Sequence, residues 1–370
     1  VGMMGFVGLA AATLVRQMGV RTLSMRLICS FIVGALLLML TDNGLMLLKH
    51  YRGTDLPAGA VTALVGAPLL LWLTAKAPPR PSFQTTSNIS TAAPHVPRLL
   101  RFLLLIAVAV SVLAFTVGRY DETLRLTIDP EYFVFRYPRV LLAAATGTML
   151  ALTGVILQRL TQNPMAGPEL LGISSGTAFG AMSVVMLFGI TSGSGWFWLT
   201  GIVSALVSLG LLMLFNRKNG FTPEKILLTG MALAALADAA IRIWMATGDF
   251  RVQLLLLWMS GSTYQATPES ALTVSLLAAA SLLLILTLQR WLGLLSLNAT
   301  IARSVGINVP LARLVLIVSS AALTALSTLL IGPLSFVGLL APHLARMLGA
   351  RLPKQQLAAA ALIGASVMMT

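Results

Sequence analysis

Two charged residues, Asp238 and Arg242, lie four positions apart inside the apolar stretch 225–246. On a helix this spacing places both side chains on one face, where they can pair. Each would cost roughly 2.5–3.5 kcal/mol on a lipid-facing surface, so we expect them to face the interior of a helical bundle. Two interpretations stay open. The favoured one is a structural ion pair near the outer end of the helix, and the other is a pathway or proton-relay residue.

Residue patterns for catalysis or metal binding are missing from the sequence. It contains no GxxxxGK[ST] or HExxH motif and no paired carboxylates within an apolar stretch. Cys29 is the single cysteine, and His50, His95 and His343 do not have the spacing of metal ligands. We therefore expect no enzyme, no metal site and no cofactor in this chain.

The composition indicates which solvent surrounds these residues. Of the 370 residues, 57% are hydrophobic and 10% are charged, whereas soluble proteins average about 25% charged residues. Such a chain cannot cover a water-facing surface, so we expect lipid around most of it. The net charge of +14 comes from short basic clusters between apolar runs rather than from a basic face, and we expect no nucleic acid partner.

Apolar stretches predict an all-α polytopic membrane protein with about twelve spans, since about 20 apolar residues cross a bilayer. The expected spans are 3–18, 27–47, 58–75, 99–118, 138–158, 170–190, 195–215, 225–246, 270–289, 310–331, 334–349 and 356–370. Glycine and proline within several of them indicate broken or re-entrant segments. The spans place the basic clusters on one side and eight of the eleven acidic residues on the other, so the basic side is predicted to be cytoplasmic.

The beginning of the chain is repeated near its end. VGMMGFVGLAAATLVRQMGVR aligns without gaps with IGPLSFVGLLAPHLARMLGAR, so that Gly8 matches Gly338 and Arg16 matches Arg346. Such a repeat indicates a parallel duplication of a ten-span unit. We expect residues 1–76 to be the last three spans of one unit and 98–370 to be spans one to nine of the next, both cropped. The Pro-, Ser- and Thr-rich residues 77–97 are expected to be a flexible cytoplasmic linker.

Three further motifs predict contacts. Gly172, Gly176 and Gly180 share a helical face at four-residue steps, which is typical of close helix packing. Residues 292–310 form two short amphipathic stretches broken at Gly306, which suits contact with a soluble partner, although an ordinary interfacial helix is the alternative. The FRYPRVLL segment places Arg136 and Arg139 at the outer end of a span, where they either snorkel or bind an acidic partner.

Five stretches together resemble one family. They are RYPRVLLAAATGTMLALTGVILQRLTQNPMAGPELLGISSGTAFG, LWMSGS, IARSVGINV, IGPLSFVGLLAPHLARMLG and LPAGAVTALVGAPLLLWL. They are similar to the permeases of ABC importers for iron-siderophores, haem and cobalamin, which have ten spans per subunit. Two such units fused in tandem resemble the branch of this family that carries iron(III)-hydroxamate siderophores.

The resemblance implies partners on both sides of a bacterial inner membrane. A periplasmic siderophore-binding protein would dock outside, where Arg136, and with it Arg139, would meet acidic residues. A cytoplasmic ABC ATPase dimer would bind the ATP and contact Ala302, Arg303 and Gly306. Mechanistically, the permease itself would do no chemistry.

The same resemblance implies the location of the path and its gate. Spans 58–75 and 225–246 would flank the central path, and Thr222, Pro223 and Glu224 would lie at the cytoplasmic gate. Permeases for another siderophore, haem or cobalamin remain alternatives. An ion-coupled secondary transporter with parallel repeats is less favoured, because it needs matching polar groups at mid-membrane in both copies.

Overall fold

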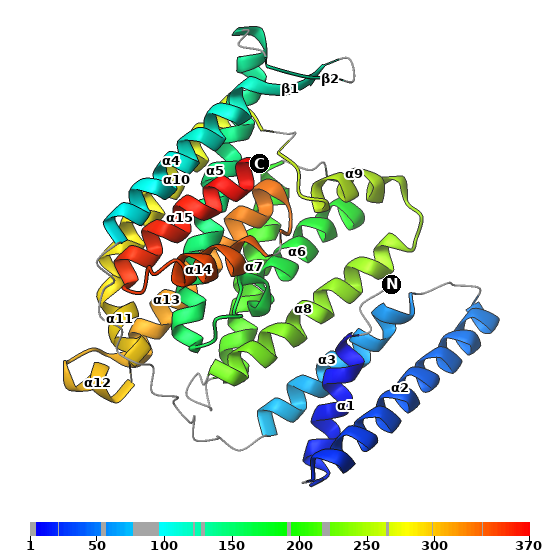
Figure 1. Cartoon of the computed structure of the whole chain (residues 1–370). Coiled ribbons are helices and arrows are strands. Elements are labelled where there is room, and N and C mark those ends of the chain that lie inside the picture. Colours follow the sequence, from blue (N-terminus) through cyan, green and yellow to red (C-terminus); the bar gives the residue numbers. More distant parts are fainter. Residues whose placement is uncertain are drawn as a thin grey trace. The chain divides into compact units, whose positions relative to one another are not determined.

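The computed structural model of the chain describes residues 5–20, 22–52, 57–76, 96–120, 123–126, 130–190, 194–216, 223–263, 266–297, 299–334 and 336–370. Almost all of these residues are helical (Figure 1). A helix satisfies its own backbone hydrogen bonds, so it is the form in which an apolar chain can cross lipid. Residues 77–95, most of the expected linker, lie outside the described part.

The helices fall into two compact units. The first unit covers residues 1–81 and 169–257, and the second covers 82–168 and 258–370. The first contains α1 (Gly5–Gln17), α2 (Leu23–Arg52), α3 (Ala58–Lys76), α6 (Ile173–Phe188), α7 (Gly195–Asn216), α8 (Pro223–Met245) and most of both η1 (Pro168–Leu171) and α9 (Phe250–Met259). The second contains α4 (Val96–Thr116), α5 (Pro130–Thr161), α10 (Pro268–Thr287), α11 (Gln289–Leu297), α12 (Ala299–Ser304), α13 (Val309–Ile331), α14 (Val337–Met347) and α15 (Pro353–Met369).

Every expected span coincides with a helix, but the helices differ in length. In the described part, seven are long and apolar enough to cross a membrane: α2, α4, α5, α7, α8, α10 and α13. α6 is an apolar helix of 16 residues, and α14 has 11 residues with Pro342 inside it. Twelve complete crossings therefore stay a prediction.

A short antiparallel hairpin departs from the expected all-helical fold. Strands β1 (Val117–Tyr120) and β2 (Thr123–Leu126) pair between α4 and α5, with Val117 opposite Leu126. The expected span 99–118 therefore loses its last residues to a strand, since α4 ends at Thr116. The valine, tyrosine and threonine residues of the hairpin favour extended backbone.

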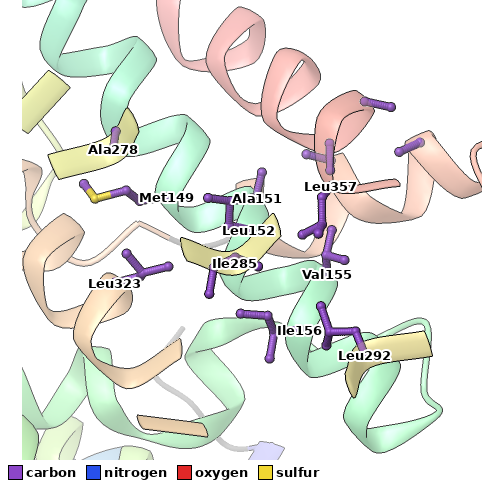
Figure 2. Packing of buried hydrophobic residues seen from close by; sticks show 14 of the residues in the cluster. Met149, Ala151, Leu152, Val155, Ile156, Ala278, Ile285, Leu292, Leu323 and Leu357 are labelled. Atoms are coloured by element: carbon purple, nitrogen blue, oxygen red, sulfur yellow. The ribbon is translucent and has the colours of Figure 1, made fainter. Parts of the chain in front are cut away.

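In the second unit, α5 forms the centre. It packs against α4, α10, α11, α13, α14 and α15, and most of its apolar length is buried. Its residues Met149, Leu152 and Ile156 are fully buried and meet side chains from the surrounding helices, including Ile285 of α10 and Leu357 of α15 (Figure 2).

Glycines bring α14 and α15 against the backbone of α5. A Cβ added at Gly154 of α5 would collide with the carbonyl oxygen of Gly338 of α14, and one at Gly147 would collide with that of Gly364 of α15. Helices in lipid associate largely through such close backbone contact, which gains dispersion energy without a hydrophobic effect.

The repeat in the sequence reappears in the helix boundaries. α1 ends at Gln17 and α14 at Met347, while α2 begins at Leu23 and α15 at Pro353. Between each pair of helices, Gly19 and Gly349 have positive φ angles of 83° and 100°. The residues that match in the ungapped sequence alignment thus also end, turn and begin the helices at matching places.

Candidate functional site

Helices α3 and α8, the expected flanks of the central path, pack against each other in the first unit. The buried residues of α3 include Ala60, Ala63 and Ala67, and those of α8 include Ala232 and Ala239. Small side chains at helical spacing let the two backbones approach closely. The structure therefore brings together α3, from residues 1–76, and α8, from residues 98–370.

On α8, the Asp238 carboxylate accepts a hydrogen bond from the Ser175 hydroxyl of α6. The expected direct contact with Arg242 is not found between these two described side chains, although the charge of Arg242 still acts on Asp238. The Ser175 hydroxyl gives the Asp238 carboxylate a hydrogen-bond partner inside the bundle. This partner is neutral, so it does not balance the negative charge of Asp238. The structure thus joins Asp238 to another helix rather than to its neighbour on α8.

Further contacts line up along α6 and α8. A Cβ at Gly172 would lie 2.6 Å from the carbonyl oxygen of Gly230. The rings of Phe179 and Trp244 are stacked, with centroids 5.2 Å apart and an interplanar angle of 8°. Together with the hydrogen bond between Ser175 and Asp238, these contacts hold the two helices together over several turns.

The three glycines of the GISSGTAFG motif serve two neighbours. Gly172 faces α8, whereas Cβ atoms at Gly176 and Gly180 would collide with the hydroxyl oxygens of Ser208 and Ser204 on α7. The predicted packing face is therefore divided between the two helices that flank α6.

A partly exposed ion pair follows the end of α8. Arg251 Nη2 lies 2.6 Å from Asp249 Oδ2, and its Nη1 donates to the Val185 carbonyl of α6 at 3.4 Å. Hydrogen bonds from Arg251 lower the pKa of Asp249, and the side-chain bonds raise the pKa of Arg251. Because both side chains are partly exposed, we expect this pair to orient the loop more than to stabilise the fold.

The predicted coupling region forms two short helices, α11 and α12. Leu292 and Leu295 of α11 are buried in the core of the second unit, and Ala302 of α12 is fully buried. Arg303, by contrast, is exposed. The buried residues anchor the helices to the bundle, while the charged side chain faces outward.

Gly306 ends α12 in a Schellman motif. Its φ angle is 85°, its N–H donates to the Arg303 carbonyl at 2.9 Å, and the Ile307 N–H donates to the Ala302 carbonyl at 3.0 Å. Asn308 then caps α13 by accepting from the Leu311 N–H. The break that the sequence predicts at Gly306 is thus a helix stop followed directly by a helix start.

A polar cluster that carries no signal in the sequence lies where α5 ends. Arg159 donates from Nε to Gln356 Oε1 at 2.7 Å and from Nη2 to the Arg351 carbonyl at 2.6 Å. Gln356, in turn, donates to the Pro342 carbonyl at 3.2 Å, and Gln158 to the Leu339 carbonyl at 3.0 Å. We call these four side-chain bonds the α5 clamp, because they tie α5 to α14 and α15, and α11 packs on α5 and α15.

Arg136 has an internal partner at the start of α5. Its Nη1 donates to the Phe115 carbonyl of α4 at 2.7 Å, and the Phe133 ring lies 5.3 Å from that of Phe115. The side chains of Arg136 and Arg139 are both partly buried. The guanidinium that was expected to meet a docking partner therefore also closes the carbonyl end of α4.

Of the expected cytoplasmic gate, Thr222 lies outside the described residues. Pro223 and Glu224 begin α8, and their side chains are outside the described part as well.

In η1, burial raises the pKa of the Glu169 carboxyl, against a smaller lowering by a backbone hydrogen bond. Its Oε2 is buried without a hydrogen-bond partner.

Trp258 of the LWMSGS motif, like the residues of the α5 clamp, makes a contact that the sequence did not predict. Its Nε1 donates to the Leu329 carbonyl of α13 at 3.3 Å, and the Ser262 N–H donates to the Ile331 carbonyl at 3.1 Å. The motif therefore binds the end of α9 to the end of α13.

Comparisons with known proteins find relatives over the whole chain. It is 39% identical to the iron(3+)-hydroxamate import system permease FhuB of Salmonella typhimurium and 38% identical to FhuB of Escherichia coli, each over 379 aligned residues. These alignments cover all of this chain and 54% and 56% of the relatives, so the chain spans about half their length. The hemin transport system permease HmuU of Yersinia pestis is 33% identical over 287 residues, 74% of this chain and 86% of that protein.

A solved structure has the same fold over most of the chain. It is a metal-chelate-type ABC transporter in an inward-facing conformation, with 29% sequence identity and a TM-score of 0.64, covering 74% of this chain and 88% of the other. The FecCD transport family matches residues 1–76 and 99–370. These matches, together with the apolar helices, identify a multi-pass membrane protein: the chain belongs to the FecCD transport family.

Proposed function

We propose that the chain is the larger part of a permease that carries iron(III)-hydroxamate siderophores across the bacterial inner membrane. The observation that supports this most is the 38% and 39% identity over the full chain to two permeases named for iron(3+)-hydroxamate import. We further propose that residues 1–76 and 98–370 belong to two tandem ten-span units. The helix boundaries at matching positions of the two copies support this organisation.

In this proposal the energy comes from outside the chain. A cytoplasmic ATPase dimer binds ATP and contacts α11 and α12 around Ala302, Arg303 and Gly306. A periplasmic binding protein delivers the ferric siderophore to the outer side near Arg136 and Arg139. Movement of α11 would then reach α5 and α15, on which it packs, and rigid-body motion of helix groups would open the path between α3 and α8 to one side at a time.

Uptake of radiolabelled ferrichrome tests the ligand. A strain lacking its hydroxamate permease is complemented with the complete gene, and ferrichrome uptake is expected to return. Unlabelled haemin is the matched competitor, since a hemin permease is also a relative. Uptake of haemin but not of ferrichrome would show that the ligand is haem and not a hydroxamate siderophore.

A charge reversal tests whether Arg303 couples ATP hydrolysis by the ATPase to uptake through the permease. Arg303→Glu is expected to leave the protein in the membrane and to lower uptake far more than ATP hydrolysis, because the new anion would repel an acidic ATPase surface that the native cation attracts. Lys354→Glu near the start of α15, also exposed and outside α11 and α12, is the control for charge alone. Normal uptake by the Arg303 variant would rule out the coupling role.

The secondary-transporter alternative is separated by its energy source. Dissipating the proton gradient at constant ATP should leave uptake unchanged if ATP drives transport. Loss of uptake in wild type under these conditions, together with insensitivity of Asp238→Asn to the gradient, would instead favour proton coupling through Asp238.

A further inference from the structure

The exposed side of α4 begins with two arginines. Arg98 and Arg101 lie in the first two turns of this helix, and both are exposed. Residues three, four and seven positions apart share one side of a helix. At this spacing, exposed apolar side chains continue the same face: Phe102, Leu105, Val108 and Val112. We call these six residues the α4 lipid face; the buried residues Leu103 and Ala107 lie on the opposite side.

Within the described part of the chain, neither Arg98 nor Arg101 has a hydrogen bond or an ion pair. Arg26, in the first turn of α2, is different. It donates from Nε and Nη2 to the Val20 carbonyl at 3.3 Å and 3.1 Å. The arginine at the start of α2 is thus bound by its own chain, whereas the two on α4 can bind a partner from outside.

The charges at the start of α4 favour an anionic partner. Arg98 and Arg101 are three positions apart, so two like charges lie next to each other on the helix surface. The amino end of a helix adds partial positive charge, and the first turn of α4 contains no acidic residue. A bound anion would therefore relieve repulsion at this point.

The direction of α4 is fixed by its contact with α15. The two helices pack on each other, and Ser111 near the end of α4 donates to Met369 Sδ at the end of α15 at 3.4 Å. Figure 1 shows both helices starting at the same end of the second unit. A Cβ at Gly293 would lie 3.3 Å from the Pro353 ring, so α11, which directly follows α10, also lies at this end.

The acidic residues of the second unit are at its other end. They are Asp121, Glu122, Asp129, Glu131 and Glu269. The first four come in the sequence after α4 ends and no later than the first turn of α5. Glu269 lies in the first turn of α10, whereas it is the end of α10 that leads to the start of α15. The second unit thus has no carboxylate of its own to balance Arg98 and Arg101.

The composition of the face points to a molecule with an anionic head and an apolar tail. Two neighbouring guanidinium groups can donate several hydrogen bonds to one phosphate, which arginine binds in a bidentate manner. Leu105, which is 68% exposed, and Val108 continue the face into the hydrocarbon, where acyl chains lie. An acidic protein surface would match the arginines but not the apolar side chains that follow them.

We propose that the α4 lipid face is a binding site for an anionic phospholipid such as phosphatidylglycerol. Its phosphate binds Arg98 and Arg101, and an acyl chain lies along Leu105 and Val108. Basic clusters at a membrane surface attract anionic headgroups in this way. The site depends neither on the transported ligand nor on the tandem organisation proposed above.

Photo-cross-linking in proteoliposomes identifies the lipid. The protein is expressed from its complete gene, purified with the subunits that remain bound to it, and reconstituted in equal amounts of dioleoylphosphatidylglycerol and dioleoylphosphatidylcholine. p-Benzoylphenylalanine replaces Phe102, and mass spectrometry distinguishes the two lipid adducts. Each arginine should strengthen binding of the anionic headgroup about fivefold. Phosphatidylglycerol adducts should therefore exceed phosphatidylcholine adducts by about 25-fold.

The same probe on α10 is the control for bulk lipid. Leu283 is 65% exposed and lies about one turn before α10 ends at Thr287. It is therefore near the same end of the unit as Phe102, but it is not on the α4 lipid face. Here we expect the two lipids to give equal adducts.

Removing the arginines provides the second measurement. Arg98→Gln combined with Arg101→Gln should lower the adduct ratio at Phe102 by about 25-fold, and Arg101→Gln alone by about fivefold. The matched control combines Arg303→Gln with Arg346→Gln. It removes the same charge from exposed positions of the second unit and should leave the ratio unchanged.

Three outcomes would overturn the proposal. They are equal adducts of both lipids at Phe102 in the protein that retains both arginines, an equal preference for phosphatidylglycerol at Leu283, and adducts at Phe102 with a protein subunit in place of lipid. Because none of these measurements needs uptake, a failure of the transport assignment is seen separately.

Discussion

Arg159 at the end of α5 donates a hydrogen bond of 2.7 Å to Gln356 of α15, 197 residues further along the chain. The same guanidinium donates to the Arg351 carbonyl, so one side chain satisfies two acceptors from the segment that begins α15. Lysine has a single side-chain nitrogen, so it cannot place one donor at each acceptor as the Nε and Nη2 atoms of Arg159 do.

Arg159→Lys should therefore destabilise the protein by about 1–3 kcal/mol, because a partly buried acceptor loses its donor. Thermal unfolding in detergent measures the change. Combining Arg159→Lys with Gln356→Leu should cost less than the sum of the two single changes, since both remove one interaction. Strict additivity in this double-mutant cycle would show that the two residues act independently.

Gly154→Ala should disrupt the second unit. The new Cβ would collide with the Gly338 carbonyl oxygen and crowd the Pro342 ring, and overpacking of this kind typically costs about 1–3 kcal/mol. Size-exclusion chromatography and thermal unfolding report the loss of folded protein. Gly210→Ala on α7, where nothing lies within 4 Å, is the matched control and should be neutral or slightly stabilising.

Gly306→Ala should loosen the end of α12. A residue with a Cβ is strained at a φ of 85°, by roughly 1–2 kcal/mol, so the last turn and the cap of α13 should open more often. Hydrogen exchange of residues 299–311 measures this opening. Gly306→Asn, which tolerates left-handed backbone better, should exchange at an intermediate rate, and equal rates in all three proteins would contradict the role of the turn.

The buried carboxyl of Glu169 predicts a pH dependence. Its pKa is raised above the ordinary value of 4.5 by burial, so the folded state holds the proton more tightly than the unfolded state does. Stability from this group is complete below pH 4.5 and is lost as pH rises through the folded pKa.

Glu169→Gln keeps a neutral side chain at every pH and should remove this dependence. The melting temperature of wild type should fall relative to that of the variant between pH 4.5 and neutral pH. Glu269→Gln, an exposed glutamate in the first turn of α10, controls for charge loss. A constant difference between wild type and Glu169→Gln across this range would refute the prediction.

The positions of the helices could be predicted because hydropathy reports directly on lipid contact. Span 195–215 corresponds to Gly195–Asn216, and span 310–331 to Val309–Ile331. α5 begins at Pro130 rather than at 138 because its first two turns mix charged and aromatic residues, which hydropathy alone does not include. The hairpin was not predicted because four-residue strands beside an apolar run carry little periodic signal.

The contacts within the candidate site were harder to predict. Asp238 was expected to pair with Arg242, four residues away, but its partner Ser175 comes from another helix. Arg159, Gln158 and Gln356 each look like ordinary polar residues near the end of a span. Their partners lie far away in sequence, and no local pattern encodes such long-range pairs.

The α5 clamp also constrains the order in which the protein can be made. Gln158 donates to the Leu339 carbonyl, and 181 residues separate them. At about 5–20 residues per second, a ribosome takes roughly ten to forty seconds to supply that partner. During this interval α5 resides in the bilayer without the Leu339 acceptor of Gln158, so a membrane chaperone or the insertion machinery itself has a defined period in which to hold it.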